Sequence, residues 1–239
     1  MKVLVFDIYG DLAHFRKFYT TSSPLTFPFP PPSTIKGMLG AIIGVDKKDY
    51  LRVFSSDHCK IGLQILRPVK KIRLGLNHIN TKQNYWIPTK RGSHEARTQI
   101  RTEFVKDPGY RLYVAHEDKV IFEDLVRKVK NHEAVFTPAL GLSELLADFQ
   151  YQKVLEVEER RKEGEADLVT VIPLLYLEGL RITFEKGKKY FKERIPVRMN
   201  EERVVEEYQE VIFESEGKPI QAETQKSWEG EGSGGLLFF

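Results

Sequence analysis

The 239-residue sequence has one cysteine and no long apolar run, and each absence excludes a class of protein. With Cys59 alone, one chain forms no internal disulfide and no cysteine-based metal cluster, so we expect Cys59 to be a small buried apolar residue. No apolar stretch approaches the roughly 18 residues of a membrane span. An acid and a glycine, Asp7 and Gly10, lie where a secretory signal would stay apolar. We therefore expect an N-terminal strand and a cytoplasmic protein without a membrane partner.

Motifs for nucleotide hydrolysis and metal binding are also missing. The loop at 139–144 has one glycine and no Gly-Lys-Ser/Thr, so it is not predicted to hold a nucleotide. The six histidines show none of the spacings typical of metal ligands. The aromatic signature of a standard RNA-recognition module is absent as well. We expect no cofactor and no required metal.

What the sequence has instead is a strong separation of charge. Residues 1–106 hold 18 Lys/Arg against 7 Asp/Glu, whereas residues 107–239 hold 19 against 27. Residues 60–106 alone hold 11 basic and 2 acidic side chains. Such a concentration suits a polyanion, and nucleic acid is the first candidate. A basic face without a ligand is the competing interpretation.

Periodicity and turn residues predict an α+β fold. Alternation predicts a first strand at 2–8, and a helix at 35–43 follows a proline-rich segment. Asp107-Pro108-Gly109 is a turn signal that predicts a hairpin of 98–106 with 110–115. The clearest helix is at 118–131, where apolar residues share one face, and a strand is expected at 149–157.

The order strand, helix, strands, helix, strand is typical of ferredoxin-like and RNA-recognition folds. We therefore expect a ferredoxin-like (RNA-recognition-like) N-terminal domain at 1–157, with a basic insertion at about 77–97. A β-rich C-terminal part is expected at 158–239. Its tail, 214–235, is rich in Glu, Gly, Ser and Lys and is predicted to be mobile, while 236–239 would dock on a partner or be buried.

Basic and aromatic residues interleave directly after the first strand, at 13–19. In such a mixture, cations meet phosphates while rings stack on unpaired bases. We expect Arg16 and Lys17 to contact RNA and Phe18 to be a core residue. Lys36 and Gly37, at the start of the predicted helix, would let a phosphate approach closely.

The N-terminal fifth of the chain resembles the CRISPR-associated (Cas) protein family five. The resemblance rests on the first strand, Gly10, the Phe15-Arg16 pair and the segment LTFPFPPPSTIKGMLGAIIG at 25–44. That family supplies the guide-RNA 5′-handle subunit of type I surveillance (Cascade) complexes. The resemblance implies a non-catalytic subunit that binds guide RNA, helps assemble the backbone and large subunits, and meets target DNA through the complex.

The resemblance also implies that the basic insertion is a thumb that packs against the guide RNA and the first backbone subunit. Tyr85, Trp86 and Ile87 would anchor the thumb. The residues expected to contact phosphates in and beside it are Lys71, Arg73, Lys90, Arg91, Arg97 and Arg101. For Lys71 and Arg73, an ordinary edge strand that discourages aggregation explains the pattern equally well.

Two other functions stay open at this point. One branch of the resembled family cuts precursor guide RNA with a tyrosine, a lysine and an adjacent histidine. This sequence has no Lys-His neighbour pair, and His14 and Tyr50 are its candidates for a metal-independent endoribonuclease. The other alternative is a scaffold that binds only proteins. RNA binding predicts a steep loss of affinity with salt, which a protein-only scaffold would not show.

Overall fold

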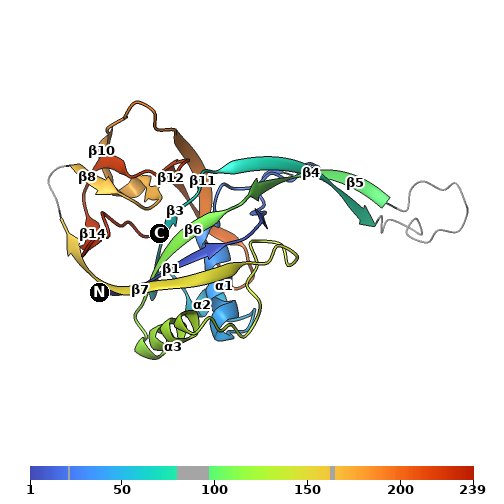
Figure 1. The fold of residues 1–239 in the computed structure, drawn as a ribbon, viewed down its shortest axis with the longest axis horizontal. Helices are drawn as coiled ribbons and strands as arrows, with labels where there is room; N and C mark the ends of the chain where they lie inside the picture. Colours follow the sequence, from blue (N-terminus) through green and yellow to red (C-terminus); the bar gives the residue numbers. More distant parts are fainter. Residues whose placement is uncertain (21, 80–96, 162–164) are drawn as a thin grey trace, which may run out of the picture.

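The computed structural model describes residues 1–20, 22–79, 97–161 and 165–239, and it has a mixed α/β fold with more strand than helix (Figure 1). The helices are α1 (Pro32–Ile43), α2 (Tyr50–Val53), α3 (Lys119–Lys130) and the short 3-10 helix η1 (Leu174–Tyr176). The strands are β1 (Lys2–Tyr9), β2 (Leu12–Ala13), β3 (Cys59–Ile65), β4 (Lys70–Ile79), β5 (Arg97–Lys106), β6 (Gly109–His116), β7 (Asp148–Arg160), β8 (Glu165–Leu168), β9 (Ile172–Pro173), β10 (Leu177–Ile182), β11 (Tyr190–Met199), β12 (Val205–Glu214), β13 (Ile220–Thr224) and β14 (Ser227–Gly230).

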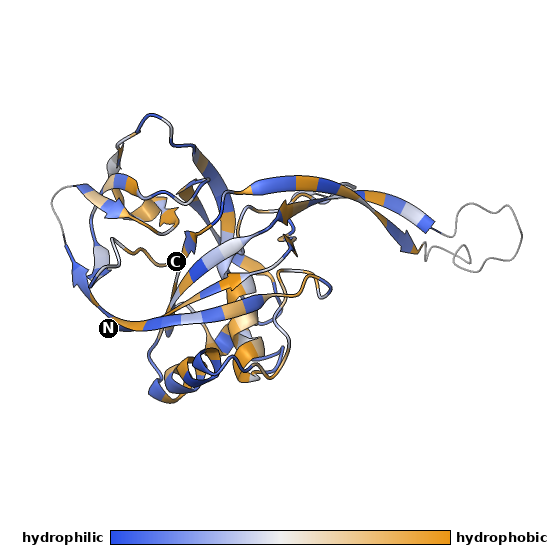
Figure 2. Ribbon diagram, viewed as in Figure 1, coloured by the Kyte–Doolittle hydropathy of each residue, from blue (hydrophilic) through white to orange (hydrophobic). Residues whose placement is uncertain are grey.

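A five-stranded antiparallel sheet forms the centre of the molecule, in the order β14-β7-β1-β6-β3. Side chains alternate along β1, so Leu4, Phe6 and Ile8 share one face, where all three are fully buried. They pack in one core with residues of α1 and α3, among them Leu39 and Leu125. Each such side chain contributes about 1.5–3 kcal/mol by its burial. Figure 2 shows hydrophobic residues along β1 and α1, and mostly hydrophilic residues on α3.

The two long helices begin in different ways. Pro31 precedes α1 and Pro32 is its first residue, a position where the missing N–H costs nothing. Asp118 caps α3, because its side chain accepts hydrogen bonds from the backbone N–H groups of Val120 and Ile121. The predicted helix at 118–131 is confirmed. Within the described ranges, no helix is both long and apolar enough to cross a membrane.

The long hairpin β4–β5 extends away from the rest of the molecule (Figure 1). At its base β5 also pairs with β2, whereas β6 pairs with β1 and β3. The predicted hairpin of 98–106 with 110–115 is therefore wrong. Asp107 has a φ of 50° at this turn and donates its backbone N–H to the Asp11 carbonyl, so the chain passes from one sheet into another.

The C-terminal strands form two further sheets, β10-β13-β8 and β11-β12-β9. The boundary expected after residue 157 falls inside β7, and β14 extends the central sheet beside that strand. The tail expected to be mobile contains β13 and β14, so that expectation is wrong. Leu236, Leu237 and Phe238 are buried in one apolar cluster with Val3 and Val5 of β1. Burial of this apolar end is one of the two outcomes that the sequence allowed.

Candidate nucleic-acid interface

The register of β4 with β5 divides the side chains of the hairpin between two faces, because directly paired residues point to the same side. Arg73 pairs with Glu103, Gly75 with Arg101, and Ile79 with Arg97. We call this side the basic face, and its cations are Lys71, Arg73, Arg97 and Arg101. The opposite side carries apolar pairs such as Ile72 with Phe104 and Leu76 with Ile100.

Glu103 is the single acid of the two strands, and it lies between two cations of the basic face. The Lys71 Nζ donates to Glu103 Oε1 at 3.0 Å, and the Arg73 Nη2 lies 3.6 Å from Oε2. Burial alone would raise the pKa of the Glu103 carboxyl, but the bond from Lys71, a backbone N–H at Thr26 and the charge of Arg73 together lower it. Glu103 therefore stays ionised and fixes both cations in place.

Arg97 and Arg101 differ from these two residues, because among the described residues they have no charge partner. Both are exposed, and neither forms an ion pair with any acid in the part of the chain that the structure describes. The outer half of the basic face therefore carries positive charge that no described acid compensates. Cations of this kind can bind the phosphates of a nucleic acid. Phosphate contacts fix the position of the nucleic acid without reading its sequence.

A cleft of about 250 Å³ lies on the basic face, at the base of the hairpin. One wall is Arg73, Arg101 and Glu103, and the other is the segment 23–25. This segment is held against β5, because the Glu103 backbone N–H donates to the Pro24 carbonyl at 2.9 Å. The cleft combines exposed guanidinium groups with a rigid apolar wall.

A second pocket, of about 310 Å³, lies on the opposite side of the hairpin. Its apolar walls and polar groups are contributed by His14, Phe15, Arg16, Pro24, Thr34, Leu76, His78, Thr102, Gly141 and Leu142. Thr34 belongs to the first turn of α1, where the helix dipole favours an anion. Mostly apolar walls with a few polar groups are usual for a small-ligand pocket of this size.

Gly141 closes this second pocket from the loop between α3 and β7. Its φ is 102°, and an added Cβ would lie 1.9 Å from the His14 carbonyl oxygen. The His14 backbone N–H donates to the Leu140 carbonyl at 3.0 Å, so the loop is held tightly against residue 14. Only glycine fits at this position.

The two candidates for catalysis lie in different places. His14 is buried, and its Nδ1 lies 2.7 Å from the Glu103 carbonyl oxygen, which can only accept a hydrogen bond. Its ring nitrogen is thus oriented by the backbone and not by a carboxylate. Tyr50 lies against Gly37 and Gly40 of α1 and lines another pocket. The structure does not bring His14 and Tyr50 together.

Lys17 and Lys36 are both buried, and neither is one of the cations of the basic face. The Lys17 Nζ forms an ion pair with Glu193 at 2.5 Å, and the Lys36 Nζ donates to the Ser56 hydroxyl at 3.2 Å. Burial lowers the pKa of the Lys36 ammonium. Gly37, next to Lys36, accommodates the ring of Tyr50. In these positions the three residues support the packing of α1 and of the N-terminal segment.

Of the remaining residues predicted to contact RNA or anchor the thumb, one is exposed and the others lie outside the residues that the structure describes. Arg16 is exposed, and its Nη2 donates to the Thr20 carbonyl at 3.0 Å. Lys90 and Arg91, and the expected thumb anchors Tyr85, Trp86 and Ile87, lie outside the described residues.

Two residues near this interface, Phe18 and Glu103, were not predicted correctly from the sequence. The prediction of Phe18 as a core residue is wrong, because 52% of it is exposed, whereas Phe15 is buried. Glu103 was not singled out, although a lone acid in a strongly basic pair of strands is a signal for an internal ion pair.

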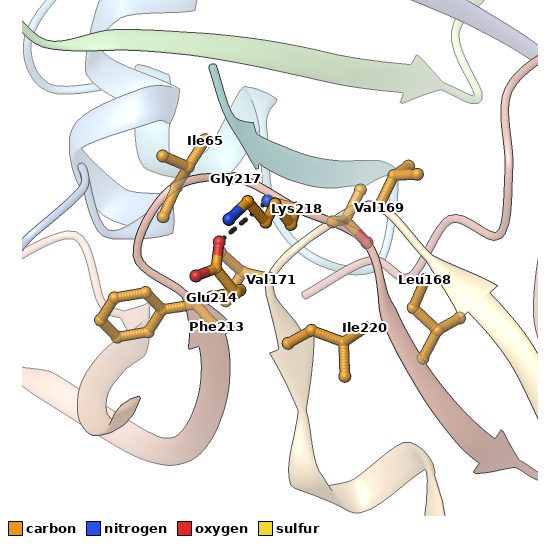
Figure 3. A pocket seen from close by; sticks show the side chains of 10 residues that line it. Ile65, Leu168, Val169, Val171, Phe213, Glu214, Gly217, Lys218 and Ile220 are labelled. Atoms are coloured by element: carbon orange, nitrogen blue, oxygen red, sulfur yellow. Dashed lines mark hydrogen bonds between the residues drawn. The ribbon is translucent and has the colours of Figure 1, made fainter. Parts of the chain in front are cut away.

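A small cavity lies between β3 and the turn after β12. It has a volume of only about 10 Å³, room for roughly one water molecule. The buried Glu214 carboxylate beside it accepts hydrogen bonds from the backbone N–H groups of Lys189, Glu216 and Lys218, the last at 2.9 Å (Figure 3). The Glu214 carboxylate therefore holds the turn after β12. Across the residues that the structure describes, no three His, Cys, Asp or Glu side chains are grouped to hold a metal ion.

The fold and this interface define a small α/β protein with a basic hairpin, and comparison with known proteins gives its family. Residues 3–212 match the family model described as CRISPR-associated protein (Cas_Cas5). The chain belongs to the Cas5 family of CRISPR-associated proteins. No curated protein matches it in sequence.

Solved structures share this fold at low sequence identity. A CRISPR protein from Archaeoglobus fulgidus is 16% identical, with a TM-score of 0.57 and 100% of both chains covered. A chain described as CRISPR RNA-guided surveillance complex is 14% identical, with a TM-score of 0.52 and 91% of each chain covered. At identities this low, the likeness shows a shared fold and nothing finer.

Proposed function

We propose that this Cas5-family chain is a non-catalytic subunit of a type I CRISPR surveillance complex and binds the 5′ handle of the guide RNA. The observation that carries the proposal is the basic face, on which Arg97 and Arg101 are exposed without an acidic partner among the described residues. The cleft beside it continues this charge to the base of the hairpin. The likeness to a chain of an RNA-guided surveillance complex supports the same function.

The domain architecture that we propose rests on the order of the strands in the central sheet. The strands β7-β1-β6-β3, with α1 after β1 and α3 after β6, support a ferredoxin-like domain at 1–157. We assign the hairpin β4–β5 as the base of a thumb that contacts the guide RNA and the first backbone subunit. The β-rich part at 158–239 is then free to meet the large subunit, and target DNA is reached through the assembled complex.

Handle binding is tested by filter retention of labelled handle RNA across a salt series. Wild-type protein should lose affinity steeply as salt rises, because phosphate contacts release counterions. Arg97→Ala and Arg101→Ala should each reduce the slope of log affinity against log salt by about 1. Lys130→Ala, which removes an exposed cation from α3, is the matched control and should leave the slope unchanged.

The same incubation, analysed on a gel with precursor guide RNA, separates the alternatives. Salt-sensitive binding without a cut supports the handle subunit. A discrete cut within the repeat would overturn the non-catalytic proposal. Absence of RNA binding by the wild type, with other subunits still captured, would favour a protein-only scaffold.

A further inference from the structure

Four side chains form an exposed cluster beside the base of the hairpin, and we call it the aromatic platform. Its members are Phe18, Tyr19, Arg194 and Tyr208. The ring of Phe18 lies 5.1 Å from Tyr19 at 90° and 4.8 Å from Tyr208 at 50°. The Arg194 guanidinium lies over the Tyr208 ring, 4.9 Å from its centroid. Phe18 and Tyr19 are 52% and 57% exposed, so two neighbouring rings present their surfaces to solvent.

An ion pair links the two parts of the platform, which are distant in sequence. Lys17, next to Phe18, is paired with Glu193, which is next to Arg194 on β11. The Lys17 ammonium also lies 5.7 Å from the centre of the Tyr19 ring. Exposed apolar side chains that gather in one contiguous patch mark a binding surface, whereas scattered ones are ordinary.

A short segment connects the platform to the basic face. Residues 23–25 form one wall of the cleft that also contains Arg73 and Arg101. At the end of this segment, the Lys71 Nζ donates to the Thr26 carbonyl at 2.7 Å. The Lys17 backbone N–H donates to the Leu25 carbonyl at 2.8 Å, so the residue that precedes Phe18 lies against the segment that lines the cleft.

Charge at the platform favours a nucleic acid over a protein partner. The acids nearest to it on β11 and β12 are already paired, Glu193 with Lys17, Glu206 with Arg198 and Glu210 with Lys192. Arg194 has no ion-pair partner among the described residues, and Arg16 is exposed nearby in sequence. Cations that follow a backbone, combined with rings on which bases stack, are the usual features of a single-strand binding surface.

We propose that the aromatic platform stacks an unpaired base of the single-stranded RNA whose phosphates contact the basic face. The proposal rests on the proposed function, because the basic face must bind RNA for the base to reach the rings. Phe18 and Tyr19 supply the stacking surface. Tyr208 and Arg194 support Phe18 from below, and the ion pair of Lys17 with Glu193 fixes the spacing of the two parts.

The test uses the full chain and handle RNAs that each carry one 2-aminopurine, moved through the sequence one position at a time. Stacking quenches this fluorophore, so at least one position should lose fluorescence on binding. Phe18→Leu and Tyr19→Leu keep an apolar side chain but remove the ring. They should abolish the quench and weaken binding by about 5-fold or more, with the salt slope unchanged.

Phe184→Ala is the matched control. Phe184 is also exposed, at 71%, and also packs edge-on against a tyrosine, Tyr190, but it lies after β10 and away from the platform. It should change neither the quench nor the affinity. Phe18→Trp, which keeps an aromatic surface, should retain the quench, and thermal melts establish that each variant is folded.

The outcomes distinguish a failure of this inference from a failure of the proposed function. If the wild type shows no salt-sensitive RNA binding, the proposed function fails and the inference fails with it. If the wild type binds but Phe18→Leu and Tyr19→Leu keep the same affinity and quench, the inference alone is overturned. Equal affinity for duplex RNA, or loss of capture of another subunit with RNA binding unchanged, would also overturn it.

Discussion

Lys17 and Glu193 form an ion pair of 2.5 Å that joins the N-terminal segment to β11. Their side chains are only 10% and 18% exposed, so the pair is largely shielded from solvent. Burial alone would lower the pKa of Lys17, but the hydrogen bond and charge of Glu193, with a contribution from Tyr19, raise it. The pair fastens the segment between β2 and α1 to the C-terminal part of the chain.

Breaking this pair should destabilise the protein. Lys17→Met and Glu193→Leu should each lower the free energy of unfolding by about 1.5–3 kcal/mol, because each leaves the other charge without its partner. The double variant should lose much less than the sum. Urea unfolding of the four proteins measures this coupling, and additive losses would contradict it.

The same pair predicts how stability depends on pH at the alkaline end. The pKa of Lys17 is raised above its ordinary 10.5 in the folded protein. Its contribution is therefore complete below pH 10.5 and declines as the pH rises through the folded value. Lys17→Met should lack this decline.

Glu103 limits the positive charge of the basic face, and Glu103→Gln should release it. Lys71 and Arg73 would then be free to meet phosphates, so RNA affinity at low salt should rise about 3-fold and the salt slope should become steeper by about 1. Glu133→Gln, just after α3, removes an equal charge from a pair with Arg127 and serves as the control. An affinity that is unchanged or lower in Glu103→Gln would show that these two cations do not contact RNA.

Glu103→Gln should also change stability in a defined pH window. The folded pKa of Glu103 lies below its ordinary 4.5, so its stabilising contribution is present above pH 4.5 and is lost as the pH falls through the folded value. The variant should be less stable than the wild type at neutral pH, and the difference should shrink in acid. Urea unfolding at a series of pH values measures this window.

Local signals in the sequence predicted the elements better than their partners. Asp118 and the apolar face that follows it were sufficient to predict α3. The alternation of residues along the sequence was sufficient to predict β1. The turn at Asp107 was read correctly as a turn, but its residues could not reveal that β5 and β6 belong to different sheets. That choice depends on the long-range pairing of β4 with β5 and of β1 with β6.

The candidate site was predictable in its charge and not in its arrangement. The excess of Lys and Arg in 60–106 indicated a basic face, but the pairing of β4 with β5 into one hairpin was not predicted. Lys17 looked like a free cation because its partner Glu193 is 176 residues away. Phe18 looked like a core residue because its neighbours in the sequence do not show where its ring packs. The ring lies against Tyr208 of β12 and stays exposed to solvent.

Gly141 should tolerate substitution far less well than another glycine with a similar backbone. Gly141 and Gly187 have φ values of 102° and 88°, but only Gly141 faces a carbonyl oxygen, whereas nothing lies within 4 Å of a Cβ at Gly187. Gly187→Ala should cost about 1–2 kcal/mol from its left-handed backbone alone. Gly141→Ala should cost about 2–5 kcal/mol, because the loop must also move away from His14. Equal losses in urea unfolding would mean that the loop does not press on residue 14.

Lys36 gives a direct test of which cations bind RNA. Its ammonium is buried and its pKa is lowered, so the charged form costs stability at neutral pH, and this cost declines as the pH rises towards 10.5. Lys36→Met keeps the volume and removes the charge, and Ser56, which is exposed, can bond to water instead. The variant should gain about 1 kcal/mol of stability at pH 7 and keep its RNA affinity within about 2-fold. If Lys36 did contact a phosphate, the affinity would fall and the salt slope would decrease by about 1, which would move the RNA path from the hairpin to the start of α1.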